Sequence, residues 1–283
     1  MRFVALLITG LLALAAPSRA QQDEAASAWS RGTHSEIRLI AGGRAPDGGY
    51  RVGVEIRMKP GFKTYWRMPG DAGIPPSFDW SSSQNIGSVS LRWPAPERFV
   101  DAGITTIGYK DRVIFPVLVR PADAAKPVAI TLNLDYAVCD RICIPARGTA
   151  TLALPDAPET AQSAALNAFR DRVPKLGEPG KSNGFLGLMS AVFVRDGTRK
   201  AVEITVSQAQ GATVADAFLE GPEGWLFGMP QLVSTDGEVS LLRLPVEDKP
   251  KNVVGMVPLA LTLTGPAQAS EVRFDLDISN PRP

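Results

Sequence analysis

Apolar and polar residues alternate along several short segments in the first half of the chain. The pattern is clearest at residues 36–40 and 50–58, which are separated by the glycine-rich stretch 42–49. Alternation with a period of two predicts half-buried β-strands, and a glycine-rich stretch between two of them predicts a turn. The further segments with this pattern are residues 88–93, 113–120, 128–137 and 148–154. Short strands at this spacing favour an antiparallel sandwich over alternating βα units.

Two stretches of the chain interrupt the strand pattern. Residues 60–78 are rich in Pro, Gly and aromatic side chains, and we expect them to be irregular and to run along one end of the sandwich. Residues 158–172 begin with a proline and contain many alanines, a composition that predicts a helix. Residues 177–184 then have the composition of a flexible linker.

Strand signals return in the last hundred residues. The candidates are residues 188–194, 201–207, 215–220, 231–234, 238–245, 259–264 and 272–278. The predicted fold class is therefore all-β, with two immunoglobulin-like antiparallel β-sandwich domains joined by a short helical linker. The predicted parts are a first sandwich at 21–157, a helical and flexible linker at 158–184, and a second sandwich at 185–283.

The first twenty residues have the features of a secretory signal peptide. Arg2 precedes a thirteen-residue apolar run at 4–16, and small residues precede a cleavage point after Ala20. An uncleaved membrane anchor is the alternative, but the run is shorter than the ~20 residues that a spanning helix needs. We therefore expect an exported, soluble protein without a membrane anchor, in a compartment where disulfides form.

Composition and charge narrow the possible functions. The 283 residues are 45% hydrophobic and 21% charged, which indicates a globular protein and not a disordered one. A formal net charge of +1 argues against a nucleic-acid partner. His34 is the single histidine, which argues against a metal site or a catalytic triad built on histidine side chains. We expect no metal cofactor.

The two cysteines, Cys139 and Cys143, form a CxxxC pair in a β-rich segment that continues to Pro145. A disulfide between them closes a five-residue loop, worth only ~2 kcal/mol in the chain-entropy model. A chain with two hydrophobic cores gains little from such a staple, so the position favours a redox-active disulfide. A passive structural disulfide is one alternative. Binding of Cu(I) by the two thiolates is another, although the methionines show no supporting spacing.

Three segments resemble the N-terminal periplasmic domain of the DsbD and ScsB thiol–disulfide interchange family, most closely its ScsB-like branch. They are the cysteine segment 136–145, the aromatic segment 61–76, and the stretch 93–109, which is similar to the part of the family that carries a loop over the active cysteines. The resemblance covers residues 35–155. The second sandwich resembles the longer periplasmic region of the ScsB-like branch.

The chain departs from this family in two respects. The cysteines of DsbD are spaced more widely than CxxxC. DsbD and ScsB also continue into a transmembrane electron conduit and a thioredoxin-like domain, whereas this sequence ends at Pro283 without either. The expectation is a free-standing relative or the periplasmic piece of a split system.

The resemblance implies a periplasmic thiol-disulfide oxidoreductase of the protein-disulfide reductase type. A membrane-embedded thiol reductase would reduce the cysteine pair, which would then reduce oxidised thioredoxin-like periplasmic proteins. Cys143 matches the residue that attacks the partner, and Cys139 the residue that resolves the mixed disulfide. The other residues expected to shield the cysteines or set their pKa are Tyr65, Trp66, Phe99, Asp101, Tyr109, Tyr136 and Asp140.

Other interpretations of the same residues stay open. Each of the aromatic side chains could be ordinary sandwich core. The whole protein could be a Cu(I)-binding copper-tolerance protein, or a redox-inert adaptor whose cysteines form a structural disulfide. No cofactor other than the Cys139–Cys143 disulfide is expected.

Overall fold

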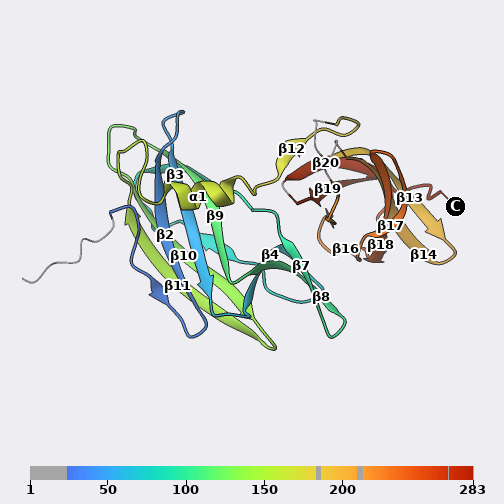
Figure 1. Ribbon diagram of the computed structural model, residues 1–283, viewed down its shortest axis with the longest axis horizontal. Coiled ribbons are helices and arrows are strands. Elements are labelled where there is room, and N and C mark those ends of the chain that lie inside the picture. Colours follow the sequence, from blue (N-terminus) through green and yellow to red (C-terminus); the bar gives the residue numbers. More distant parts are fainter. Residues whose placement is uncertain (1–23, 183–185, 209–212, 267, 283) are drawn as a thin grey trace, which may run out of the picture.

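The computed structural model describes residues 24–182, 186–208, 213–266 and 268–282, and it consists of two β-sandwiches joined by a short connection (Figure 1). The predicted all-β, two-sandwich fold is confirmed. The predicted signal peptide at 1–20 lies outside the described residues. No helix in the described ranges has the length and apolar character needed to cross a membrane.

The first sandwich packs two antiparallel sheets face to face. One sheet has the order β1 (Ser30–Arg31), β2 (Ser35–Arg44), β3 (Tyr50–Met58), β9 (Arg112–Pro121) and β6 (Ile86–Leu91). The other has the order β11 (Cys143–Ala153), β10 (Ala129–Cys139), β4 (Lys63–Gly70), β8 (Ile104–Lys110) and β7 (Glu97–Asp101), with β5 (Ser77–Asp79) also paired to β10.

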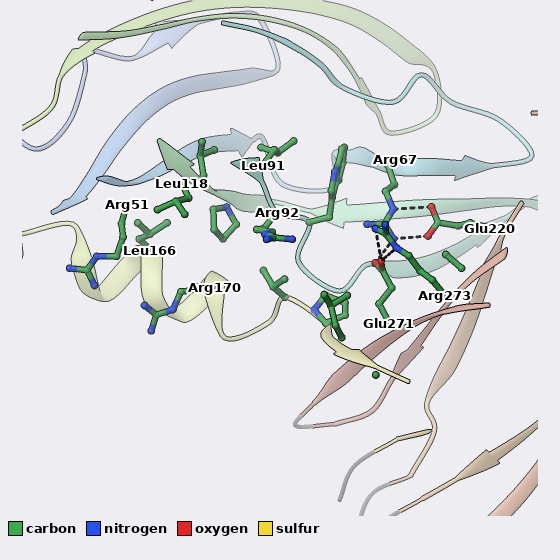
Figure 2. A pocket seen from close by; sticks show the side chains of 18 of the residues that line it. Arg51, Arg67, Leu91, Arg92, Leu118, Leu166, Arg170, Glu220, Glu271 and Arg273 are labelled. Atoms are coloured by element: carbon green, nitrogen blue, oxygen red, sulfur yellow. Dashed lines mark hydrogen bonds and ion pairs between the residues drawn. The ribbon is translucent and has the colours of Figure 1, made fainter. Parts of the chain in front are cut away.

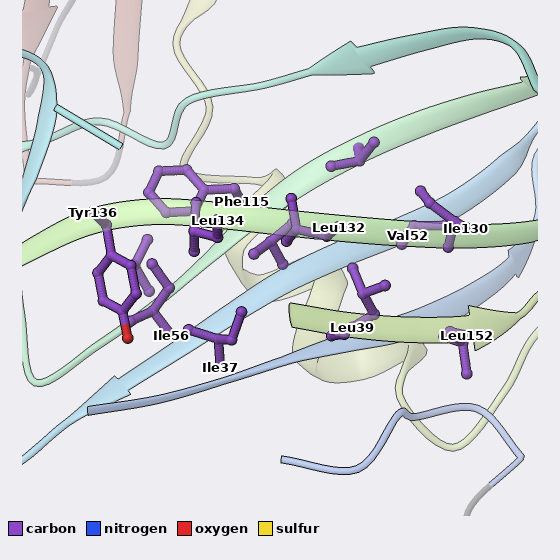
Figure 3. Close-up of a cluster of buried hydrophobic side chains, with 14 of the residues drawn as sticks. Ile37, Leu39, Val52, Ile56, Phe115, Ile130, Leu132, Leu134, Tyr136 and Leu152 are labelled. Carbon is purple, nitrogen blue, oxygen red and sulfur yellow. The ribbon is translucent and has the colours of Figure 1, made fainter. Parts of the chain in front are cut away.

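The core of this sandwich follows the alternation seen in the sequence. On β2, Ile37 and Leu39 point inward, and on β10 Leu132 and Leu134 meet them from the facing sheet (Figure 3). All four side chains are fully buried. Since successive side chains of a strand point to opposite faces, the apolar half of each strand fills the space between the sheets.

The segment predicted to be irregular, 60–78, instead contains strands β4 and β5, so that expectation was wrong. Strand β4 pairs with β8 on one side and with β10 on the other, and its register shifts between Tyr65 and Gly70. The stretch expected to be a loop over the cysteines is also a hairpin, formed by β7 and β8. It turns through Ala102 and Gly103, both of which have positive φ. These segments form strands because they pair with neighbouring strands, since their own sequences lack a clean alternation of apolar and polar residues.

Helix α1 (Ser163–Arg170) lies on the outer face of the first sandwich, over β2 and β9 (Figure 1). Leu166 packs there against Ile40 and Ile114. The close approach depends on Gly42 and Gly53, since a Cβ at either position would overlap the Leu166 side chain or its neighbours. The helical segment connects the two sandwiches, as predicted, and it packs against the first of them.

The second sandwich has the same two-layer plan. One sheet has the order β12 (Lys175–Gly177), β20 (Ala269–Asp277), β19 (Met256–Thr264) and β15 (Asp216–Glu220). The other has the order β13 (Gly187–Asp196), β14 (Arg199–Ser207), β18 (Val239–Asp248) and β16 (Leu226–Phe227), with β17 (Gln231–Asp236) also paired to β18. Strands β12 and β16 were not predicted. Because β12 pairs in parallel with β20, this sandwich begins at Lys175 and not at residue 185.

Strand β15 of the second sandwich lies against β4 and β7 of the first. The Arg67 guanidinium donates to Glu220 Oε1 at 2.6 Å and to Glu271 Oε2 at 2.7 Å. Arg98 forms a similar pair with Asp216, with 2.9 Å between Nε and Oδ2. Phe218 is fully buried and belongs to the core of the first sandwich. Charged pairs around one buried aromatic ring therefore join the sandwiches.

Candidate functional site

The two cysteines face each other at the end of the β10–β11 hairpin. Cys139 is the last residue of β10, Cys143 is the first of β11, and the register pairs them directly. Directly opposed residues of an antiparallel pair have Cα atoms about 4.5–5.5 Å apart, which lies within the range that a disulfide spans. Both are free thiols in this structure. The hairpin can therefore carry the reduced or the oxidised pair without moving its strands apart.

The two thiols differ in their access to solvent. Cys139 is 7% exposed, whereas Cys143 is exposed at the tip of the hairpin, next to Ile142 with 71% of its surface accessible. A sulfur must reach a partner's sulfur at bonding distance to exchange with it. Only Cys143 is placed for that contact, and Cys139 lies behind it.

Tyr65 reaches the cysteine pair from strand β4. Its hydroxyl lies 2.8 Å from Cys143 Sγ, and its fully buried ring packs with Ala137 and Cys139. Burial, together with the neighbouring thiols, raises the pKa of the Tyr65 phenol far above its usual value. Tyr65 therefore keeps its proton over the whole pH range in which a cysteine ionises, and towards a Cys143 thiolate it is the hydrogen-bond donor.

Gly73 makes room for this tyrosine. It has a φ of +130°, a backbone conformation that favours glycine, and a Cβ at this position would overlap the Tyr65 ring. The segment between β4 and β5 thus packs closely against the Tyr65 ring. A substitution at Gly73 would displace the group that contacts Cys143.

Lys63 lies beside Cys139, two residues before Tyr65 on the same strand β4. The register of β4 and β10 places it opposite Cys139, and it is 7% exposed. Its ammonium group forms an ion pair with Asp101 and lies 5.2 Å from the centre of the Phe99 ring. Burial raises the pKa of the Cys139 thiol, as does its hydrogen bond with Cys143, while the Lys63 charge and the hydrogen bond with Tyr65 act against this rise.

The predicted site residues fall into two groups. Tyr65, Phe99, Asp101 and Asp140 lie around the pair: Tyr65 contacts Cys143, the β7–β8 hairpin residues Phe99 and Asp101 contact Lys63, and the Asp140 carbonyl lies 3.9 Å from Cys139 Sγ. Trp66, Tyr109 and Tyr136 form the other group and lie in the core.

Trp66, Tyr109 and Tyr136 do not shield the cysteines, and for them the core interpretation holds. Trp66 packs edge-on against Phe218 of the second sandwich, with ring centres 5.7 Å apart. Buried Tyr109 donates its hydroxyl to the Pro94 carbonyl at 2.8 Å. The Tyr136 hydroxyl lies 2.7 Å from Ser35 Oγ. Each hydroxyl is satisfied within the fold, which is the usual state of a buried tyrosine.

Sequence reasoning missed Lys63 and Gly73. The signal for Lys63 was its place as one of two cations, with Arg67, inside the aromatic segment 61–76, which is also compatible with a solvated side chain. Within the described ranges, no three His, Cys, Asp or Glu side chains are grouped as metal ligands.

The chain is similar to known proteins in both sequence and fold. Residues 37–155 match the family model "Thiol:disulfide interchange protein DsbD, N-terminal". The fold is similar to that of the N-terminal periplasmic domain of ScsB from Proteus mirabilis, at 22% identity and a TM-score of 0.69, covering 90% of this chain and 99% of that one.

The other similarities are weak. The GAE domain of yeast GGA1 aligns at 12% identity and a TM-score of 0.27, over 46% of this chain and 98% of that one, which is too low to bear on the argument. No curated protein sequence matches the chain. Residues 37–155, the part of the chain that carries both cysteines, thus match the DsbD N-terminal family model.

Proposed function

We propose that this protein is a periplasmic thiol–disulfide relay that passes electrons through Cys139 and Cys143. The observation that carries the proposal is the pairing of one exposed and one buried thiol, directly opposite each other, with a phenol hydroxyl 2.8 Å from the exposed sulfur. A structural staple would require neither the exposed sulfur nor a buried hydroxyl aimed at it.

In the first step, the Cys143 thiolate attacks a disulfide of an oxidised thioredoxin-like partner. One new S–S bond joins Cys143 to the partner, the partner's own S–S bond breaks, and its second sulfur leaves as a thiolate that takes up a proton. The Tyr65 hydroxyl donates a hydrogen bond to the Cys143 thiolate before attack. The exposed Ile142 beside it offers an apolar contact for the partner.

In the second step, Cys139 loses its proton and attacks Cys143 Sγ. The Cys139–Cys143 disulfide forms, the mixed disulfide breaks, and the partner leaves as a dithiol, so two electrons and two protons have passed to it. Burial favours the neutral thiol of Cys139 and Lys63 favours its thiolate. Lys63 thus aids the ionisation that resolution requires. A membrane-embedded thiol reductase then returns the pair to the dithiol state.

The experiment is mixed-disulfide trapping with an oxidised thioredoxin-like periplasmic protein. The Cys139→Ser variant should accumulate a covalent complex, because the complex lacks its resolving thiol, and the Cys143→Ser variant should not. The variant lacking both cysteines is the control for non-specific association. Trapping through Cys139 alone would reverse the two roles, and trapping through neither would refute the relay.

Redox titration of the wild-type pair against glutathione or dithiothreitol separates the relay from a passive staple. Structural disulfides have reduction potentials below about −300 mV, so the relay predicts a value well above this. Stoichiometric Cu(I) binding that either serine substitution abolishes, combined with no trapping, would instead support the copper-binding alternative.

A further inference from the structure

A pocket of about 1110 Å³ lies on the outer face of the first sandwich, where helix α1, the connecting segment and the second sandwich meet (Figure 2). None of the residues that line it belongs to the site described above. Pockets of this size accommodate small organic molecules.

The floor of the pocket is apolar because strand β9 is apolar on both faces. Its inward residues fill the core, while Ile114, Pro116 and Leu118 point outward. The outer face of a sandwich strand is ordinarily polar. Helix α1 covers Ile114 through Leu166, whereas Pro116 and Leu118 line the pocket. The connecting segment adds Val173 to the wall.

Arginines flank this apolar strip. Arg51 on β3 lies opposite Leu118, and Arg92 follows β6, with its backbone N–H bonded to the Pro116 carbonyl. Arg170 reaches the pocket from α1 (Figure 2). The three therefore surround the strip from separate elements.

These three cations are poorly neutralised. Arg51 donates to the Pro158 carbonyl, its Nε is buried without a partner, and neither it nor Arg92 forms an ion pair with any described residue. Arg170 has only the exposed Asp171, at 3.6 Å. At the far end of the pocket, by contrast, Glu220 and Glu271 neutralise Arg67.

We infer that this pocket binds an organic anion with an apolar body, whose carboxylate or similar head group lies among Arg51, Arg92 and Arg170. A planar guanidinium matches the geometry of a carboxylate or phosphate, and three of them without a buried counter-ion, beside an apolar strip, complement such an amphiphile. The apolar body lies along Pro116, Leu118 and Val173. The inference is independent of the redox role, since it uses neither cysteine.

The test is a fluorescence titration of the full chain with 8-anilinonaphthalene-1-sulfonate, an aromatic sulfonate. Arg92→Gln should weaken binding about tenfold, since hydrogen bonds to charged groups are the stronger class. Arg195→Gln, which removes the same charge from an exposed position of β13, is the matched control and should change nothing. Laurate should displace the dye, and uncharged dodecanol should not.

A second pair of variants distinguishes an effect of charge on binding from an effect of misfolding. Leu176 lines the pocket and is 69% exposed, so either charge is tolerated there. Leu176→Glu should weaken and Leu176→Lys should strengthen dye binding, each by about threefold, because the head group is anionic. Equal affinities for these two variants, equal effects of Arg92→Gln and Arg195→Gln, or displacement by dodecanol as strong as by laurate would each overturn the proposal.

Discussion

The two sandwiches share one architecture and differ in how they use their hairpin ends. The first places Cys139, Cys143 and Lys63 at one hairpin end, and buries Tyr65 against them. The second has the same two-layer plan, but its sequence contains neither cysteine nor histidine. The comparison teaches that the sandwich itself carries no chemistry. The candidate site consists of a few side chains added to one hairpin of a common scaffold.

Strand β4 links the two regions, because it contacts both the cysteine hairpin and the second sandwich. Tyr65 lies against the cysteines, while the next two residues, Trp66 and Arg67, contact Phe218 and the Glu220–Glu271 pair. The second sandwich is therefore attached directly to the strand that supports the thiols. The following predictions test how far the two sandwiches are independent.

The largest effect should come from opening a cavity in either core. Leu134 in the first sandwich and Leu261 in the second are fully buried, and substitution by Ala should cost about 2–5 kcal/mol in each case. If the sandwiches are separate cores, hydrogen exchange should accelerate in the substituted one and change little in the other. Equal acceleration in both for either variant would show that they unfold as one unit.

A smaller effect is expected from neutralising the buried carboxylate of the first sandwich. Glu55 is fully buried and accepts hydrogen bonds from Arg38, Arg57 and Arg112. Burial alone would raise its pKa, but these three arginines hold it below the usual value of 4.5. Glu55→Gln should reduce the free energy of unfolding at pH 7 by about 2–3 kcal/mol, as measured by urea titration.

The same carboxylate should make the first sandwich sensitive to acid. A depressed pKa contributes stability that is fully present above about 4.5 and is lost as the pH falls through the folded-state pKa. The wild type should therefore lose stability relative to Glu55→Gln below about pH 4.5. A difference between the two proteins that stays constant from pH 7 to pH 3 would contradict the assignment.

At the interface, Arg67→Ala should cost about 1–2 kcal/mol, because it leaves Glu220 and Glu271 partly buried without their shared cation. Arg273→Ala is the matched control. Its side chain is 78% exposed, and loss of its bond to Glu271 should be nearly neutral. Limited proteolysis near residues 178–182 should accelerate in the first variant and not in the second. Unchanged proteolysis would mean that the ion pairs do not hold the sandwiches together.

The smallest change is the removal of one hydroxyl at the reactive hairpin. Tyr65→Phe keeps the buried ring and removes the hydrogen bond to Cys143 Sγ. The rate of alkylation of Cys143 at pH 7 should fall about fivefold, equivalent to about 1 kcal/mol. Tyr136→Phe removes a similar hydroxyl that bonds to Ser35, and should leave the rate unchanged. Equal rates in all three proteins would remove Tyr65 from the proposed mechanism.

The alternation of apolar residues was sufficient to predict most strands of both sandwiches. Strands such as β3 and β10 carry apolar residues at every second position, and long-range packing buries the face that these residues form. Strand β4, with the sequence KTYWRMPG, has no such period and contains a proline. It is a strand because β8 and β10 hydrogen bond to it on both sides. That information lies in its neighbours and not in its own residues.

The candidate site was likewise only partly predictable. The close spacing of Cys139 and Cys143 indicated the thiol pair of the candidate site, and the aromatic segment contained its neighbour Tyr65. Sequence alone could not choose between Tyr65 and Trp66, since adjacent residues on a strand point to opposite faces and either face could be the one against the sulfurs. The burial of Lys63 could not be predicted from its own segment, because its counter-ion Asp101 belongs to a hairpin distant in sequence.

By itself, then, the sequence determined the strand periodicity, the two-sandwich plan and the identity of the thiol pair, since each is a local property of residue order. Only the tertiary structure decided which thiol is exposed, that Tyr65 contacts it, that Lys63 lies beside the other, and that α1 rests on Gly42 and Gly53. These features arise where segments distant in sequence meet. Their energies depend on burial and on partners that no single segment contains.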